Sequence, residues 1–387
     1  MRRAAFWFAA VCAVVAIASE IPRCAVVPGA PLAPRCAHRD VGDASLFLVG
    51  DAGAPRKHEA LLRALAGEAR ERVDALGAER VAIVFLGDNV YPRGLRPPEH
   101  PKRRRDERRL GMQLDAIRRS GARGFFVPGN HDWSNGDPDG WDAIRREGRY
   151  VDARGATMAP AQGCPGPAAF ALGDVFELVA VDTQWWLHAY AKPADASAGC
   201  VAATPSEAEA ALAAALRDVG GRRAIVLAHH PLVTGGPHGV RFGWREHLFP
   251  LRAFDRRLWI PLPLLGSIEP LVRTLGISDQ DLPSAPYRAL AAAFDRAFAE
   301  APPLAFAAGH DHTLQLVRTT PERFQIVSGA GSAPNVTFAY PIDGGLFAAA
   351  VPGYVRLDAF AGGDVEIAIR TLDGDGAADA YAGCLTE

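Results

Sequence analysis

Five short polar segments constrain the fold of this 387-residue chain more than any other feature of its sequence. Each segment lies at the end of an apolar run whose length is typical of a buried strand. The segments are Gly50-Asp51-Ala52-Gly53, Gly87-Asp88-Asn89-Val90-Tyr91, Gly129-Asn130-His131-Asp132, Val226-Leu227-Ala228-His229 and Gly309-His310-Asp311-His312. Because parallel sheets collect their ligands at the carboxyl ends of their strands, we expect these residues to meet at one edge.

The order of predicted strands and helices indicates an α/β fold. In the first half, strands at 45–49, 81–86 and 124–127 alternate with helices at 56–78 and 107–121. The second half adds a capped helix within 204–219 and further strands at 176–181, 223–228, 304–308, 314–318, 324–328, 354–360 and 365–369. We therefore expect a four-layer α/β/β/α sandwich of two mixed sheets.

The chain begins with Met1-Arg2-Arg3 and an apolar run at residues 4–18, which predicts a signal peptide over residues 1–18. An uncleaved membrane anchor is the alternative. An irregular lead-in is expected at residues 19–43, one domain at residues 44–372, and a loosely held C-terminal tail at residues 373–387. The predicted location is secreted, either periplasmic or extracellular.

Export would place the cysteines of the chain where disulfides persist. Cys164 and Cys200 flank a predicted strand and its following loop, and they are the favoured pair. A second link is expected to join Cys384 to the N-terminal stretch. The sequence leaves open whether Cys24 or Cys36 takes part in that link.

Residues 240–290 carry many large apolar side chains among prolines, in a run too short to cross a membrane. We expect an inserted subdomain with its own small core. A lid over the active site, or a patch that docks on a membrane or a partner, is the alternative. The formal charge of −2 is near balance, so no nucleic-acid partner is expected, and the sequence does not indicate an oligomeric state.

Seven residues of the polar segments are candidate metal ligands. Taken singly, Asp51 or Asp88 would be a turn residue or a helix cap, and His229 a buried structural histidine. Together the segments offer enough ligands for two neighbouring metal ions that share a bridge. A tyrosine ligand three residues after Asp88 suits Fe(III). The full set is Asp51, Asp88, Tyr91, Asn130, His229, His310 and His312.

With these segments in this order, the chain resembles the calcineurin-like metallophosphoesterases, and within them the purple acid phosphatases of the small tartrate-resistant type. The resemblance spans about residues 45–332, and the segments that begin at Gly87 and Gly309 carry it most closely. Gly53 stands where many metallophosphoesterases have histidine, which fits the purple acid phosphatase branch.

The resemblance implies a role for each of the seven ligands. One metal ion, Fe(III), would be bound by Asp51, Tyr91 and His312. Asp88 would bridge both ions. The second ion, Fe(II), Zn(II) or Mn(II), would be bound by Asn130, His229 and His310.

The resemblance also implies that His131 and His238 are catalytic and contact the phosphate or the leaving group. The expected function is a secreted acid phosphatase that hydrolyses small-molecule phosphate monoesters by attack of a metal-bound hydroxide. A requirement for protonated histidine would favour an acidic working pH. The alternatives are a phosphodiesterase or nucleotide pyrophosphatase with the same site, and a catalytically silent surface-binding protein.

Overall fold

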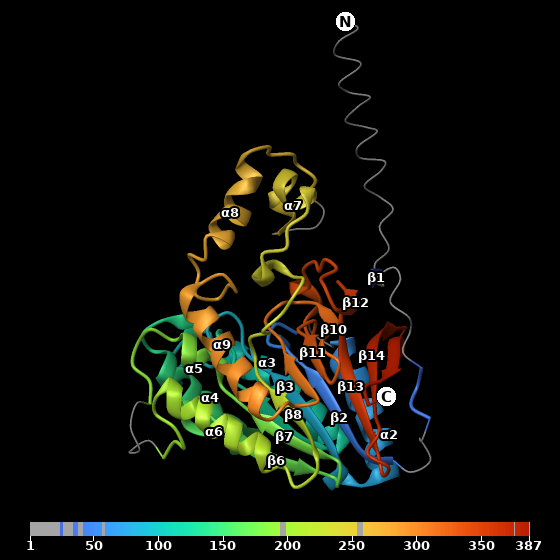
Figure 1. The fold of residues 1–387 in the computed structure, drawn as a ribbon. Helices are drawn as coiled ribbons and strands as arrows, with labels where there is room; N and C mark the ends of the chain where they lie inside the picture. The colour runs from blue at the N-terminus through green and yellow to red at the C-terminus, as the bar shows by residue number, and fades with distance from the viewer. Residues whose placement is uncertain are drawn as a thin grey trace, which may run out of the picture.

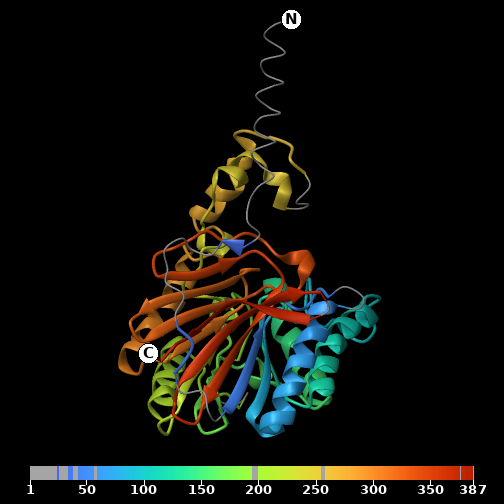
Figure 2. The same ribbon diagram turned by 90° about the vertical axis from the view of Figure 1, so that its right-hand side faces the viewer.

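The computed structural model describes residues 24–25, 34–37, 42–55, 59–193, 199–253, 258–374 and 376–386. The predicted signal peptide at residues 1–18 lies outside the described residues. Two mixed sheets form the body of the molecule, and helices cover their outer faces (Figure 1). A separate segment, which carries α7 and α8, projects from one end of this body (Figure 2).

The first sheet has seven strands, in the order β15-β14-β13-β2-β3-β4-β5. Strands β2 to β5 run parallel, and β13, β14 and β15 extend the sheet beyond β2, with each neighbouring pair antiparallel. The bounds are β2 Gly42–Val49, β3 Val81–Leu86, β4 Arg123–Val127, β5 Thr157–Met158, β13 Gly353–Phe360, β14 Val365–Asp373 and β15 Gly376–Cys384.

The second sheet has eight strands, in the order β1-β12-β10-β11-β9-β8-β7-β6. Its parallel part consists of β7, β8, β9 and β11, and its remaining pairs are antiparallel. The bounds are β1 Cys24–Ala25, β6 Ala168–Leu172, β7 Phe176–Ala180, β8 Arg223–Leu227, β9 Ala305–Ala308, β10 Leu314–Thr320, β11 Arg323–Ser328 and β12 Gly345–Ala349.

Helices α2, α3 and α4 cover the first sheet, and α5, α6 and α9 cover the second (Figure 1). Helix α6 begins with the predicted capping box, in which Thr204 and Glu207 each bond the backbone of the other. The bounds are α2 Ala60–Leu76, α3 Arg103–Ser120, α4 Gly140–Asp152, α5 Thr183–Leu187, α6 Pro205–Arg217, α7 Trp244–Leu248, α8 Ile268–Thr274 and α9 Ala285–Glu300.

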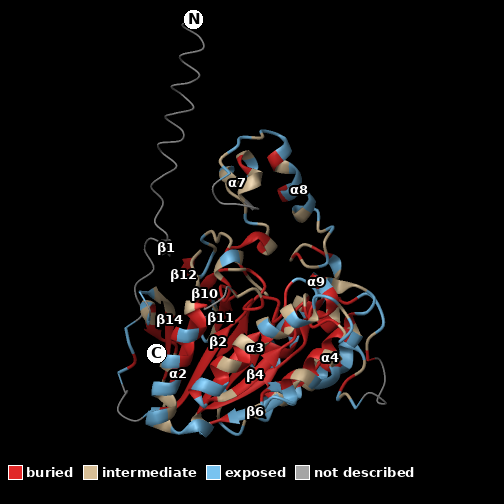
Figure 3. Cartoon of the chain, turned by 180° about the vertical axis from the view of Figure 1, so that it is seen from behind, coloured by how far each residue is buried: buried red, intermediate tan, exposed pale blue. Residues whose placement is uncertain are grey.

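Strand alternation explains why the body has three apolar layers. In β3, Ala82, Val84 and Leu86 face the core between the sheets, whereas Ile83 and Phe85 face the core under the helices. The second sheet divides its side chains in the same way between the central core and α6 and α9. Figure 3 shows the strands buried and the outer helix faces exposed. The predicted four-layer sandwich of two mixed sheets is confirmed.

The end of the chain differs from the expected loose tail. Residues Gly376–Cys384 form β15, which pairs with β14 along its length. Cys384 forms a disulfide with Cys36, so the link to the N-terminal stretch uses Cys36. The predicted Cys164–Cys200 disulfide is also present. A sequence rich in glycine and alanine lacks a strand pattern, and here the neighbouring strand and the disulfide supply the order instead.

We call residues 240–284 the arm, which the structure describes at 240–253 and 258–284. The arm leaves the body after β8 and returns to it at α9. Among the described residues of the arm, Phe249 is the buried aromatic one, and it packs edge-on against Trp244 and Trp259. In Figures 1 and 2 the arm stands away from both sheets. Among the residues that the structure describes, we find no helix with the length and apolar character of a membrane span.

Candidate metal centre

The five predicted segments follow five strands that are neighbours within the two sheets. Strands β2, β3 and β4 end before Asp51, Asp88 and Asn130, and strands β8 and β9 end before His229 and His310. Three of these residues have left-handed backbone torsions, with φ of 59° at Asp51, 55° at Asp88 and 69° at His310. Such torsions are unfavourable for residues other than glycine and often occur at functional sites. The sharp turns direct these side chains into one space.

Two glycines let the segments approach each other closely. Gly87 has a φ of 88°, and a Cβ atom there would lie 2.5 Å from Nδ1 of His229. A Cβ atom at Gly53 would lie 2.4 Å from the carbonyl oxygen of Asp88. Both distances are too short for nonbonded contacts, so packing between the loops requires glycine at both positions.

One group of donor atoms consists of Asp51, Tyr91 and His312. The Tyr91 hydroxyl donates to Oδ1 of Asp51 at 2.9 Å and lies 2.9 Å from Nε2 of His312. Nε2 of His312 lies 3.3 Å from Oδ1 of Asp51, so these three donor atoms are mutual neighbours. Asp88 offers a further carboxylate oxygen to the same group. Three or four donors that face one another at such distances could hold a metal ion.

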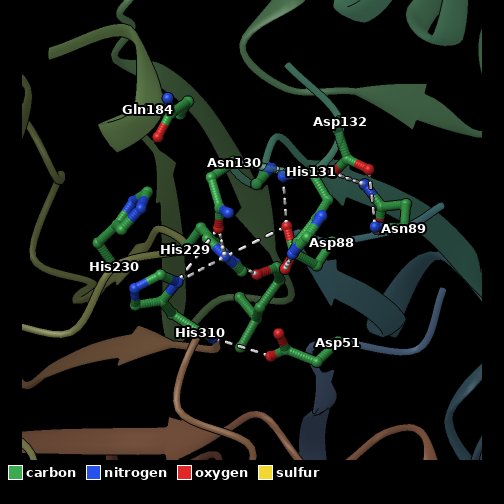
Figure 4. A network of polar contacts seen from close by, with 12 residues as sticks. Asp51, Asp88, Asn89, Asn130, His131, Asp132, Gln184, His229, His230 and His310 are labelled. Atoms are coloured by element: carbon green, nitrogen blue, oxygen red, sulfur yellow. Dashed lines mark hydrogen bonds and ion pairs between the residues drawn. The ribbon is translucent and has the colours of Figure 1, made fainter. Parts of the chain in front are cut away.

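The second group consists of Asn130, His229 and His310, whose side chains point toward one another in Figure 4. Oδ1 of Asn130 lies 3.0 Å from Nε2 of His229 and 3.2 Å from Nδ1 of His310. The two ring nitrogens are 3.3 Å apart. Oδ1 of Asp88 lies 3.4 Å from Nε2 of His229, so Asp88 adjoins both groups.

Each of the three histidines is oriented by a backbone carbonyl. In each ring, the nitrogen that faces away from the cluster donates to a carbonyl oxygen. His229 donates to Leu86 at 2.8 Å and His310 donates to Gln280 at 2.9 Å. His312 donates to Asn335 at 2.8 Å. A hydrogen bond of this kind fixes the tautomer of a metal-binding histidine and holds its other nitrogen toward the ion. The same arrangement at three histidines favours a metal site over a simple polar core.

The charges within the cluster are arranged around two buried carboxylates, Asp51 and Asp88. Burial raises the pKa of Asp88, but His131 and His229 outweigh that effect, and the pKa of Asp88 is lowered overall. Burial lowers the pKa of His312, but Asp51 outweighs it and raises that pKa to about 9. Burial and the two carboxylates raise the pKa of Tyr91 well above its usual value. A bound cation would replace these protons, as metal binding to such groups does.

The two predicted catalytic histidines lie at the rim of the cluster. Nδ1 of His131 donates to the Pro92 carbonyl at 2.7 Å, and Nε2 lies 3.7 Å from Oδ2 of Asp88. The His238 ring lies 3.8 Å from the His310 ring, measured between centroids. The side chains of His131 and His238 are 23% and 20% exposed, so both are open to solvent beside a buried cluster.

The base of the arm contributes contacts that the sequence did not indicate. Asp281 accepts from Nδ1 of His238 at 2.8 Å and from Arg273 of α8 at 2.9 Å. The carbonyl of Gln280 accepts from His310, and the Gln280 side chain lies 2.8 Å from Nε2 of His230. These residues lie outside the five segments, and no local pattern distinguishes them from other polar residues of a loop.

His230 is a geometric alternative to Asn130, because His229, His230 and His310 also lie close enough together to hold an ion. Both ring nitrogens of His230 already have side-chain partners, Thr183 at 2.7 Å and Gln280 at 2.8 Å. Burial lowers the pKa of His230 well below its usual value, so the ring is neutral. We therefore assign His230 to the packing behind the cluster.

A buried carboxylate braces the loops that carry the site. Asp132 accepts backbone N–H groups from Gly129, Asn89 and Val90 and also the side-chain amide of Asn89 (Figure 4). It thereby joins the loop that follows β3 to the loop that follows β4. Burial, Glu147 and Asp88 raise the pKa of Asp132 well above its usual value.

Comparison with known proteins adds evidence on the fold. No family model matches the sequence, and no curated protein matches it. Among solved structures, GAP50, the anchor in the inner membrane complex of Plasmodium, has a TM-score of 0.53 at 15% identity, with 89% of each chain covered. PhoD has a TM-score of 0.52 at 12% identity, with coverage of 90% of this chain and 70% of PhoD.

The purple acid phosphatase PPD1 from yellow lupin (Lupinus luteus) is also similar, with a TM-score of 0.49 at 12% identity over 89% of this chain and 54% of that chain. At these identities the likeness concerns the fold, which is the metallophosphoesterase fold. The two groups of donors that this fold brings together indicate a dinuclear metal site.

Proposed function

We propose that this chain is a secreted acid phosphatase that hydrolyses small-molecule phosphate monoesters at a dinuclear metal centre. The observation that carries the proposal is the convergence of seven donor side chains from separate strand ends, with Asp88 shared between the two groups. A hydrogen-bonded polar core could be built with fewer charged groups. Two carboxylates, a phenol and three carbonyl-oriented imidazoles are the donor set of a metal pair.

The residues present fit two metal ions. Asp51 and Asp88 are almost fully buried, and buried carboxylates require compensating positive charge. In the proposed assignment one ion is Fe(III), because a phenol oxygen is a hard ligand, and the other is Fe(II), Zn(II) or Mn(II). Two bound cations would supply Lewis acidity and hydroxide near neutral pH. The first ion would be held by Asp51, Tyr91 and His312, the second by Asn130, His229 and His310, with Asp88 between them.

The two rim histidines are the groups that we propose act on the substrate. His238 donates its Nδ1 proton to Asp281, which leaves Nε2 as the nitrogen that exchanges a proton with the leaving group. His131 is held in the same way by the Pro92 carbonyl, with Nε2 directed to the side of Asp88. A protonated ring at either position would also stabilise negative charge on the phosphate.

The test is metal analysis of the purified chain together with its rates on p-nitrophenyl phosphate and on bis(p-nitrophenyl) phosphate from pH 4 to pH 9. We expect two metal ions for each chain and a faster rate on the monoester, highest at acidic pH. A faster rate on the diester would favour the phosphodiesterase alternative. A chain that binds no metal, or that hydrolyses neither ester, would contradict the proposal.

Tyr91→Phe tests the iron assignment separately. A tyrosine bound to Fe(III) absorbs visible light by charge transfer, so the native chain should be coloured and the variant colourless. The phenylalanine ring keeps the packing against His131 and loses only the hydroxyl that contacts Asp51 and His312. A colourless native chain that contains zinc or manganese would contradict Fe(III) while leaving the dinuclear site in place.

A surface-binding protein without catalysis is the second candidate. It is favoured by the likeness in fold to GAP50, which is described as a membrane-complex anchor, and by the exposed apolar residues of the arm. The complete set of seven donors favours the enzyme, because a binding protein has no need of both metal groups. Loss of activity on chelation, with activity restored by added metal, would separate the two candidates.

A further inference from the structure

Two of the three ligand histidines are oriented by the body of the molecule, and the third is oriented by the arm. The carbonyl that accepts from His229 lies at the end of β3, and the carbonyl that accepts from His312 lies between β11 and β12. His310 donates instead to the carbonyl of Gln280, in the base of the arm at residues 273–281. Of the two proposed ions, the second is therefore the one with a ligand histidine that the arm orients.

The carbonyl of Gln280 adjoins two histidines at once. Its oxygen lies 2.9 Å from Nε2 of His310 and 3.0 Å from Nδ1 of His238. The two rings lie against each other, with 3.8 Å between their centroids. One carbonyl group of the arm therefore contacts both a proposed metal ligand and a proposed catalytic residue, so a movement of this group would disturb both rings.

The side chain of Gln280 fixes the position of that carbonyl. Its amide oxygen lies 2.8 Å from Nε2 of His230, and its amide nitrogen donates to Gln184 at 3.2 Å. His230 lies beside His310 in Figure 4, and Gln184 belongs to α5, which covers the second sheet. Because His230 and Gln184 are both buried, the Gln280 side chain attaches the base of the arm to the interior of the body.

The backbone on either side of this carbonyl is held as well. The N–H groups of Gln280 and Asp281 donate to the hydroxyl and the carbonyl of Ser278, at 3.2 and 3.1 Å. The N–H group of Leu282 donates to the carbonyl of His238 at 3.0 Å. Since the arm begins just after His238, this last bond joins its two ends and closes the turn that carries Gln280.

Asp281 supplies the remaining attachment of the base. Its Oδ1 accepts from Nδ1 of His238 at 2.8 Å and from Arg273 of α8 at 2.9 Å. The carboxylate is buried, and a buried carboxylate without such partners would be strongly unfavourable. The arrangement with the base against the body is therefore the one in which this charge is paired. We call the base docked when it makes these contacts.

From these contacts we propose that Gln280 is a positioning residue for His310, and that the second ion binds tightly only while the base of the arm is docked. This inference rests on the metal centre proposed above. A carbonyl that accepts from a ligating imidazole fixes its tautomer and orientation, and loss of such a partner typically weakens metal binding by about 10- to 100-fold. The first ion, whose histidine is oriented by the body, should not depend on the arm.

Calorimetric titration of the metal-free chain with Zn(II) tests the proposal. Gln280→Ala removes both side-chain contacts that hold the carbonyl in place. The matched control is Tyr340→Phe, which removes a different hydrogen bond between body and arm, donated by Tyr340 to Glu246 at 2.6 Å. Gln280→Ala is also measured in the His310→Ala chain, which keeps the proposed ligands of the first ion.

We expect the native chain to bind two Zn(II) ions, and Gln280→Ala to bind one of them at least about tenfold more weakly. Tyr340→Phe should bind both ions as the native chain does. In the His310→Ala chain, Gln280→Ala should not weaken the remaining ion further. Equal weakening of both ions, or native affinities in Gln280→Ala, would overturn the proposal. A native chain that binds no Zn(II) would contradict the metal centre itself, and this inference with it.

Hydrogen exchange supplies a second measurement that requires no variant of the arm. Because coupling between two equilibria is reciprocal, an ion that binds more tightly to the docked base stabilises that base by the same factor. Adding Zn(II) to the metal-free native chain should therefore slow amide exchange at residues 280–282 by at least about tenfold, since their N–H groups bond within the docked base or to His238. Exchange at these amides that does not respond to Zn(II) would refute the coupling.

Discussion

At the metal centre, buried polar side chains are held from several directions, whereas in the arm large apolar side chains face solvent. His229, for example, is fully buried and contacts groups from the segments that follow β3, β4 and β9. Leu264 is 86% exposed on a projecting turn. The comparison teaches that one edge of the sandwich can carry two kinds of surface. The strand ends hold the buried polar cluster, and the inserted arm supplies the exposed apolar surface.

The two regions meet at residues 273–281. Arg273 belongs to the helix with the exposed apolar face, and its contact with Asp281 leads directly to His238. The base of the arm, at residues 273–281, therefore contacts the residues of the metal centre, whereas the exposed turn at Leu264 does not. If this division is correct, substitutions in the two regions should change different properties.

The largest expected effect is on catalysis. His229→Ala removes a proposed metal ligand from the centre of the cluster, so turnover of a phosphate monoester should fall by at least about 10³-fold. Circular dichroism of the metal-free variant should resemble that of the metal-free native chain. Leu264→Gln is the matched control from the arm and should leave turnover unchanged. Native turnover in His229→Ala would refute the two-metal assignment.

The next effect is on stability, where two glycines with nearly equal φ can be compared. Gly87 and Gly77 have φ of 88° and 89°, but a Cβ atom would meet His229 at the first position and open space at the second. Gly77 has a φ of 89° and a ψ of 152°, so Gly77→Ala should cost about 1–3 kcal/mol of unfolding free energy from backbone strain alone. Gly87→Ala should cost about 3 kcal/mol or more, because the clash adds to the strain. Urea denaturation measures both, and equal losses would show that the loops can separate freely.

The buried carboxylates behind the site should make stability depend on pH. Burial raises the pKa of Glu147 to about 7, so the folded chain binds this proton more tightly than the unfolded chain does. The resulting stabilisation is complete below about pH 4.5 and is lost as the pH rises through about 7. Between pH 5 and pH 8 the unfolding free energy of the chelator-treated native chain should therefore fall, by at most about 3 kcal/mol from this group.

Glu147→Gln supplies the comparison for that pH dependence. Glutamine has a similar shape and does not titrate, so the decrease between pH 5 and pH 8 should be smaller in the variant. Chemical denaturation at the two pH values measures the difference. An identical decrease in both proteins would show that Glu147 does not carry the pH dependence.

The smallest expected effect concerns the arm itself. Leu264 and Leu275 are 86% and 65% exposed, so the double change to glutamine should alter unfolding free energy by less than about 0.5 kcal/mol. Thermal unfolding of the isolated chain checks this expectation. A large loss of stability would mean that these side chains pack within the folded chain, which would remove the contrast between the two regions.

Much of the site was accessible to sequence reasoning because its signals are local. A buried strand followed at once by a ligand residue is a short pattern, with a glycine before the ligand in four of the five segments. These five patterns predicted side chains that the structure brings together. The support around them was not accessible. Gln280 and Asp281 contact the histidines only because the arm folds back onto the site.

By itself, the sequence determined the layered α/β fold, the strand ends that carry the donors and the chemistry of those donors. The tertiary structure decided which nitrogen of each histidine faces the cluster, which cysteine joins Cys384, and that residues 376–384 are a strand. The physical reason is range. Apolar periodicity and donor type are properties of neighbouring residues, whereas tautomers, disulfide partners and edge strands depend on groups that meet only after the sheets have paired.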